Sequence, residues 1–138
     1  MINITGGCHC GEVTFQASVD PKKVIICHCS DCQKLSGSTF RSVVMSAANG
    51  VTFTKGEAKE YIKVAESGNK RAQGFCSNCG SGLYATSEEK ANRVYGIRVG
   101  VVDQRNELIP HCQIWHRSAV PWLNKLNSLP AFETVPTQ

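Results

Sequence analysis

Apolar and polar residues alternate along several short stretches of this chain. From Val13 to Val19 every second residue is apolar and the residues between are polar, which is the pattern of a half-buried strand. The apolar run Val24–Ile26 leads into a group of cysteines and predicts a buried strand. Further strands are predicted at 40–45, 51–54, 60–64, 71–75, 83–86, 93–102 and 113–115. The sequence therefore predicts a mainly β fold with one or two short helices.

Helical patterns are fewer than strand patterns. Residues 31–35 predict one helical turn, which Gly37 stops. Residues 118–127 predict a longer helix, because Pro121 is tolerated in a first turn. The apolar face of this second helix would carry Trp122, Leu123 and Leu126.

Turn signals and chain length set the expected domain organisation. The pair Asn49-Gly50 is a strong hairpin signal and predicts a turn at 47–50. Residues from 128 onward contain two prolines and little periodicity, which predicts a loose surface tail. A chain of 138 residues fits one domain. We expect this domain at 1–127 and the tail at 128–138.

Composition and charge narrow the classes of partner. The formal net charge is +4, but only Lys22-Lys23 and Lys70-Arg71 are adjacent basic pairs. Nucleic-acid-binding proteins usually carry a dense basic patch, so this scattered charge argues against a nucleic-acid partner. Mild attraction of anions is compatible with the charge. A chain of this size can bury a core, so a bound metal would add to folding rather than replace it.

Seven of the eight cysteines fall into three clusters, at 8–10, 27–32 and 76–79. Thiolates one or two residues apart can converge on one metal ion, and zinc is the usual ion for such sites. An even number of cysteines would also suit a disulfide scaffold in a secreted protein. However, the first residues show no secretory signal and no apolar run is long enough to span a membrane. We therefore expect a cytoplasmic protein with reduced, metal-binding cysteines.

Two of the clusters each hold a pair of cysteines, and two pairs complete a tetrahedral zinc site. Cys76 and Cys79 are followed by Gly80, which permits the tight turn of a zinc knuckle. Cys8 and Cys10 are the simplest partner pair. We expect these four cysteines to bind a structural Zn²⁺ that joins the amino terminus to the middle of the chain.

The central cluster then stands alone with Cys27, Cys29 and Cys32. A zinc site with three protein ligands and an open fourth position is typical of catalysis. A fourth ligand from elsewhere would weaken this interpretation, and the candidates are Cys112, His9, His28, His111 and His116. We expect Cys112 to be a small buried apolar residue instead. The four histidines are expected to be hydrogen-bonded or exposed.

A zinc ion with three thiolates carries a net charge of about −1. Such an electron-rich ion is a poor Lewis acid, so hydrolysis through zinc-bound hydroxide is not its natural reaction. It still keeps a coordinating thiol deprotonated. The site therefore favours activation of a substrate thiol for attack on an electrophilic carbon.

Four motifs resemble those of the glutathione-dependent formaldehyde-activating enzyme family, which includes centromere protein V. They are Gly6–Val13, Cys27–Ser38, Phe75–Ser81 and Ile114–Trp122, and the resemblance spans about Gly6 to Leu123. It implies a β-rich zinc fold like that of Mss4 and methionine sulfoxide reductase B. It also implies two Zn²⁺ per chain, a structural one on Cys8, Cys10, Cys76 and Cys79 and a catalytic one on Cys27, Cys29 and Cys32.

The family reaction is reversible addition of the glutathione thiol to formaldehyde, classed as a carbon–sulfur lyase. The resemblance implies that this chain acts on glutathione or a similar thiol and a small aldehyde. Many relatives have a histidine where this chain has Gln113, with His111 two residues earlier. Lys34 and Arg41 flank the central motif and are candidates to bind the substrate's carboxylates.

The proton carrier is expected among His28, Ser30 and Asp31, because these side chains alternate with the metal ligands and the reaction needs a positioned acid or base. A second hypothesis is a non-catalytic, zinc-stabilised binding module for a protein or nucleic-acid partner. A closed central site that exchanges no ligand with small thiols would favour that module. The sequence leaves open the oligomeric state and the physiological thiol.

Overall fold

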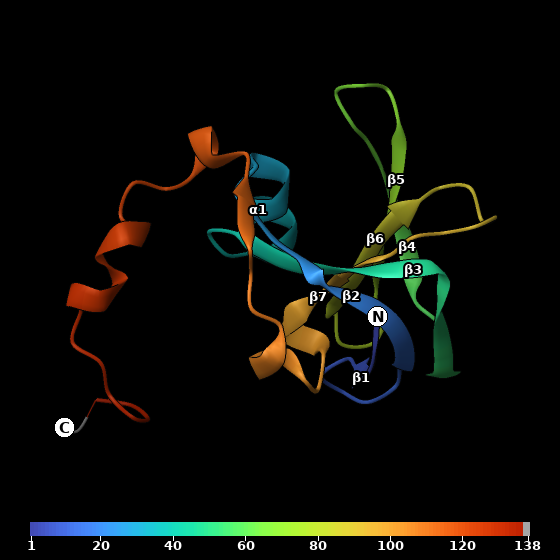
Figure 1. Ribbon diagram of the computed structural model, residues 1–138, viewed down its shortest axis with the longest axis horizontal. Helices are drawn as coiled ribbons and strands as arrows, with labels where there is room; N and C mark the ends of the chain where they lie inside the picture. The colour runs from blue at the N-terminus through green and yellow to red at the C-terminus, as the bar shows by residue number, and fades with distance from the viewer. Residues whose placement is uncertain (137–138) are drawn as a thin grey trace.

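The computed structural model describes residues 1–136, and one eight-stranded sheet organises them (Figure 1). The strands are β1 (Ile2–Gly7), β2 (Thr14–Cys27), β3 (Arg41–Lys55), β4 (Lys59–Val64), β5 (Lys70–Phe75), β6 (Gly82–Ser87), β7 (Gly96–Arg98) and β8 (Cys112–Ile114). Their order is β1-β2-β3-β7-β6-β5-β4 with antiparallel neighbours, and β8 pairs in parallel with β2. The helical elements are α1 (Ser30–Ser36) and the 3₁₀ turns η1 (Val99–Val101), η2 (Arg105–Glu107), η3 (His116–Ser118) and η4 (Leu123–Ser128). The predicted mainly β fold is confirmed.

The strands β2 and β3 are long and bent, and they pair along both of their halves. Val24 lies opposite Val44, and Ala17 lies opposite Val51. The predicted turn at 47–50 is therefore wrong, because both flanking segments belong to one strand. The residues between them form an irregularity in which Asn49 has φ = 54°. An extra segment of this kind bends a strand and increases its twist without reversing it.

One row of paired residues crosses the core face of the sheet. It runs through Val24, Val44, Ile97, Tyr84, Gly74 and Glu60. Residues opposite each other on neighbouring strands share a face, so their side chains pack as one layer. The first three are between 0% and 2% exposed. Gly74 leaves space for the Tyr84 ring, since a Cβ there would lie 2.2 Å from Tyr84 Cζ.

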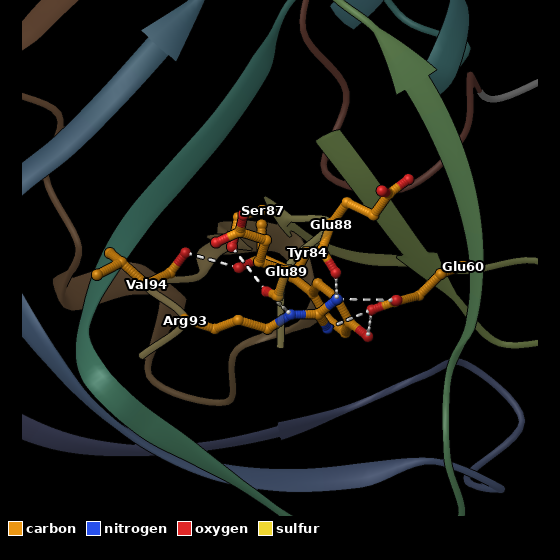
Figure 2. Close-up of polar contacts among 8 residues, drawn as sticks. Glu60, Tyr84, Ser87, Glu88, Glu89, Arg93 and Val94 are labelled. Carbon is orange, nitrogen blue, oxygen red and sulfur yellow. Dashed lines mark hydrogen bonds and ion pairs between the residues drawn. The ribbon is translucent and has the colours of Figure 1, made fainter. Parts of the chain in front are cut away.

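Glu60 ends this row in a polar network that Figure 2 shows. Tyr84 Oη donates to Glu60 Oε2 at 2.7 Å. The Arg93 guanidinium donates to both oxygens of the same carboxylate, at 2.8 and 3.2 Å. Arg93 also donates to the carbonyls of Glu88 and Glu89, and it is only 7% exposed. The network therefore ties the 88–94 loop to β4 and β6.

Two predictions of short elements from local sequence patterns are confirmed. The predicted helical turn is α1, and Gly37 ends it with φ = 65°. The predicted short strand near 113–115 is β8. The long strand predicted at 93–102 is wrong, because only Gly96–Arg98 are extended and η1 follows at once. The strand β1 was missed, although Ile4 is almost fully buried in it.

The helix predicted at 118–127 is also wrong. The chain forms the 3₁₀ turns η3 and η4 there, and Trp122 and Leu126 are each 48% exposed. The expected apolar face has no core to pack against, because the chain after β8 runs away from the sheet (Figure 1). Residues 128–136 are exposed, as a surface tail requires. The domain boundary at 127 stays a prediction.

Candidate metal centres and the adjoining pocket

Four cysteines meet between two strand connections that are far apart in the sequence. Cys8 and Cys10 lie between β1 and β2, and Cys76 and Cys79 lie between β5 and β6. Their four sulfurs all lie within 4.8 Å of one another. Cys8 and Cys76 are buried, while the other two reach the surface. The structure thus brings together the four cysteines that the sequence paired.

The two connections have the same local geometry. In each, the amide of the first cysteine donates to the carbonyl five residues later, at 2.9 Å for Cys8 and 3.0 Å for Cys76. In each, the second cysteine is followed by a glycine with positive φ, 81° at Gly11 and 80° at Gly80. Glycine adopts this conformation without steric cost. Both turns therefore point their two sulfurs toward one centre.

The sulfur positions fit a tetrahedral metal site. The Sγ atoms of Cys8 and Cys10 are 3.6 Å apart, and those of Cys10 and Cys76 are 3.8 Å apart. A disulfide bond needs about 2.05 Å, so these are free thiols. Zinc–sulfur bonds of about 2.3 Å in a tetrahedron place the sulfurs about 3.8 Å apart. This cluster could bind a metal ion.

Hydrogen-bond donors lie close to three of these sulfurs. The Val13 amide donates to Cys8 Sγ, and Asn78 Nδ2 donates to Cys10 Sγ, both at 3.2 Å. Hydrogen bonds from the side chain and amide of Ser81 lower the pKa of Cys79 to about 5. A thiolate is the form that binds metal.

The second cluster forms where β2 passes into α1. Cys27 ends β2, Cys29 is the N-cap of α1, and Cys32 lies in its first turn. Cys29 Sγ accepts a hydrogen bond from the Cys32 amide at 3.3 Å. The three sulfurs lie within 4.8 Å of one another, and this cluster could also bind a metal ion. Burial raises the pKa of Cys32 to about 12, so metal binding here must displace its proton.

Among residues 1–136, no other histidine, cysteine or carboxylate joins these three sulfurs within that distance. Cys112 lies opposite Ile25 in the parallel β2–β8 pair, away from the cluster. The expectation that Cys112 is buried is wrong, because all three residues of β8 are exposed at the sheet edge. His111 Nδ1 accepts from the Val24 amide at 3.2 Å. His9 and His116 are exposed.

His28 is held in place by a hydrogen bond to Gln113. His28 Nε2 donates to Gln113 Oε1 at 2.7 Å, and the ring is 2% exposed. With the proton on Nε2, Nδ1 is buried and has no hydrogen-bond partner in the described residues. The ring packs against Phe40 and His116, with centroids 5.9 and 5.5 Å away. Gln113 therefore orients the histidine between two cysteines of the cluster.

The other two predicted proton carriers are at the surface. Asp31 pairs with Lys63 at 2.8 Å, and this contact lowers the pKa of Asp31. Ser30 opens α1 and is exposed.

A pocket of about 780 Å³ lies beside α1 and over β3, β4, β5 and β7. Its lining includes Arg41, Gln73 and Arg98. Arg41 is opposite Cys27 in the β2–β3 register, so the pocket adjoins the three-cysteine cluster. Lys34, the other predicted carboxylate-binding residue, is exposed and outside the lining. No local pattern in the sequence points to Gln73 and Arg98, because only the register of the sheet brings them to this pocket.

Within the described residues, no helix has the length and apolar character that a membrane span requires. A crystal structure of a Rhodobacter sphaeroides protein matches this fold with a TM-score of 0.60 and 17% identity, covering 79% of this chain and 98% of that chain. That likeness supports the fold alone.

The sequence was also compared with known proteins and with protein families. The cytochrome c-type protein NrfH of Wolinella succinogenes is 25% identical over 133 residues, covering 75% of each protein. Haem attachment in c-type cytochromes uses Cys-x-x-Cys-His. In this chain the residues that follow the two Cys-x-x-Cys sequences are Gln33 and Gly80, where haem attachment requires histidine. The family described as glutathione-dependent formaldehyde-activating enzyme matches residues 3–118, so this chain belongs to that family.

Proposed function

We propose that this protein binds two zinc ions and reversibly adds a thiol, glutathione or a close relative, to formaldehyde or another small aldehyde. The reaction is that of a carbon–sulfur lyase. The observation that carries the proposal is the three-cysteine cluster, which has no fourth protein ligand among the described residues and adjoins a large pocket. Family membership supports glutathione and formaldehyde as the substrates.

The two centres have different roles in this proposal. Cys8, Cys10, Cys76 and Cys79 hold a structural ion that links the β1–β2 connection to the β5–β6 connection. A metal that joins segments so distant in sequence stabilises the folded state directly. We also propose a cytoplasmic location, because both clusters need reduced thiols and all eight cysteines are free.

The three-cysteine cluster is the proposed catalytic centre. Zinc held by Cys27, Cys29 and Cys32 would keep a substrate thiol deprotonated at neutral pH. The pocket orients the substrate so that its sulfur reaches the three-cysteine cluster. Attack on the aldehyde forms one carbon–sulfur bond and leaves an alkoxide, which must take up a proton. His28 and Ser30 remain the side chains to substitute for that step, since Asp31 is engaged by Lys63.

Exchange NMR on glutathione, formaldehyde and their adduct at equilibrium tests this function. Zinc-loaded protein should speed the exchange, Cys29→Ser should abolish the increase, and Cys112→Ser should retain it. The control removes an exposed cysteine outside both clusters. Unchanged exchange with wild-type protein that holds two zinc ions would eliminate this substrate pair. Equal rates for wild type and Cys29→Ser would remove the three-cysteine cluster from the reaction.

A further inference from the structure

Two arginines in the pocket share one neutral acceptor. Gln73 Oε1 accepts from Arg98 Nη2 at 2.7 Å and from Arg41 Nη1 at 3.3 Å. Arg98 is 9% exposed, and Arg41 Nε is buried without a hydrogen-bond partner. Two guanidinium groups therefore converge on a single amide oxygen at the wall of the pocket.

The register of the sheet explains why these residues meet. Arg98 lies opposite Val43, two residues along β3 from Arg41, so both arginines point to the same face. Cys27 lies directly opposite Arg41 and shares that face. Gln73 lies on the same face, because it pairs with Ala85 of β6 and Ala85 pairs with Gly96 of β7. Gly96 is two residues along β7 from Arg98. The arginines, the amide and the cysteine cluster thus belong to one face of the sheet.

The two pocket arginines have no carboxylate partner within the described residues. The ion pairs of the described residues are Lys23–Asp20, Lys63–Asp31 and Arg93–Glu60, and neither pocket arginine belongs to them. Burial, followed by repulsion from Arg41, lowers the pKa of Arg98 to about 9. The nearby Cys27 and Cys32 favour the charged form of Arg98 and oppose this shift. Because no carboxylate of the described residues engages either guanidinium, the pocket favours an anion.

We propose that Arg41 and Arg98 bind a carboxylate of the thiol substrate, which makes the enzyme selective for anionic thiols; this rests on the function proposed above. A planar guanidinium matches a carboxylate with two parallel hydrogen bonds. Since Arg41 stands opposite Cys27, the bound carboxylate and the sulfur at the cysteine cluster lie close together. A peptide thiol fits this arrangement when a carboxylate is on the cysteine's neighbouring residue, as the glycine carboxylate of glutathione is.

Binding can be tested apart from the reaction with S-methylglutathione, whose sulfur is blocked and whose carboxylates remain. Calorimetric titration of zinc-loaded protein should show at least tenfold weaker binding of its diethyl ester. Arg98→Met and Arg41→Met should each weaken binding of S-methylglutathione at least tenfold. Arg105→Met, the same substitution at an exposed arginine, should leave the affinity unchanged. Arg98→Lys should fall between wild type and Arg98→Met, because lysine keeps the charge and loses the planar fork.

Three results would overturn the proposal. The first is equal affinity of the acid and its ester for wild-type protein. The second is unchanged affinity in both arginine variants with two zinc ions retained. The third is loss of one zinc ion from these variants with ligand affinity intact, which would make the arginines counter-charges of the cysteine cluster. Circular dichroism establishes that each variant is folded, and half-buried Arg41 provides the milder substitution if Arg98→Met unfolds the protein. If the exchange reaction fails while S-methylglutathione still binds through the arginines, the proposed function alone is wrong.

Discussion

Gly74→Ala tests the packing that supports the pocket floor. The new Cβ would lie 2.2 Å from Tyr84 Cζ and 2.4 and 2.6 Å from the two Cε atoms. Carbon atoms in packed proteins approach to about 3.5 Å, so the ring must move. Tyr84 is 5% exposed, and its ring packs against Tyr95 at 4.8 Å and Phe53 at 5.9 Å between centroids. Little space is available for that movement.

The expected loss has two parts. Moving the ring breaks the 2.7 Å hydrogen bond from Tyr84 to Glu60, and a hydrogen bond to a charged group contributes about 1.5–3 kcal/mol. Overpacking of a filled core costs about 1–3 kcal/mol more. Gly74→Ala should therefore lower the free energy of unfolding by about 2.5–6 kcal/mol.

Urea denaturation of zinc-loaded protein, followed by circular dichroism, measures this change. Gly82→Ala is the matched control, because Gly82 lies in the paired strand β6 and a Cβ there has no heavy atom within 4 Å. The control should stay within about 1 kcal/mol of wild type. If Gly74→Ala behaves like Gly82→Ala, the contact between the Gly74 backbone and the Tyr84 ring does not hold in solution.

Three further predictions concern the metal centres, pH and the tail. Cys76→Ser should lower the free energy of unfolding by about 4 kcal/mol or more, and Cys27→Ser by less than half as much while abolishing aldehyde–thiol exchange; equal unfolding of both would contradict the division of roles. Burial alone would raise the pKa of Glu60, but hydrogen bonds from Arg93 and Tyr84 lower it below its usual 4.5. The contribution of the ionised Glu60 to the free energy of unfolding is therefore fully present above pH 4.5 and is lost as the pH falls through its folded-state pKa. Glu60→Gln should make the free energy of unfolding fall less steeply with decreasing pH in the acid range. An unchanged acid dependence would exclude Glu60 as its source. Removing residues 128–138 should change the free energy of unfolding by less than about 0.5 kcal/mol, because residues 128–136 are exposed; a larger loss would show that the tail packs on the fold.

The sequence predicted those parts of the site that local chemistry decides. The spacing of Cys76 and Cys79 and the glycine after them specify one turn, whatever the rest of the fold does. The helix after the central cysteines ends at Gly37 for the same local reason. These short-range features arrange the cysteines within each cluster, whereas Cys8 and Cys10 meet Cys76 and Cys79 across connections that are far apart in the sequence.

What the sequence could not predict depends on strand pairing between distant residues. Asn49-Gly50 is as compatible with a bulge as with a hairpin, and only the pairing of both halves of β3 with β2 decides between them. Arg98 and Gln73 are separated by 25 residues, and they meet through the β5–β6–β7 register. Similarly, β7 is short because η1 turns the chain, which the Val- and Ile-rich sequence does not reveal.

We propose that the three-cysteine centre has an open position for a substrate thiol. Zinc X-ray absorption measures it directly, as the mean number of sulfur neighbours per zinc ion in protein that holds two ions. One four-sulfur and one three-sulfur centre average about 3.5, and glutathione should raise the mean to about 4. Cys29→Ser, loaded with whatever zinc it retains, should show no such increase. A mean of 4 before glutathione is added, or no rise at saturating glutathione, would contradict the account.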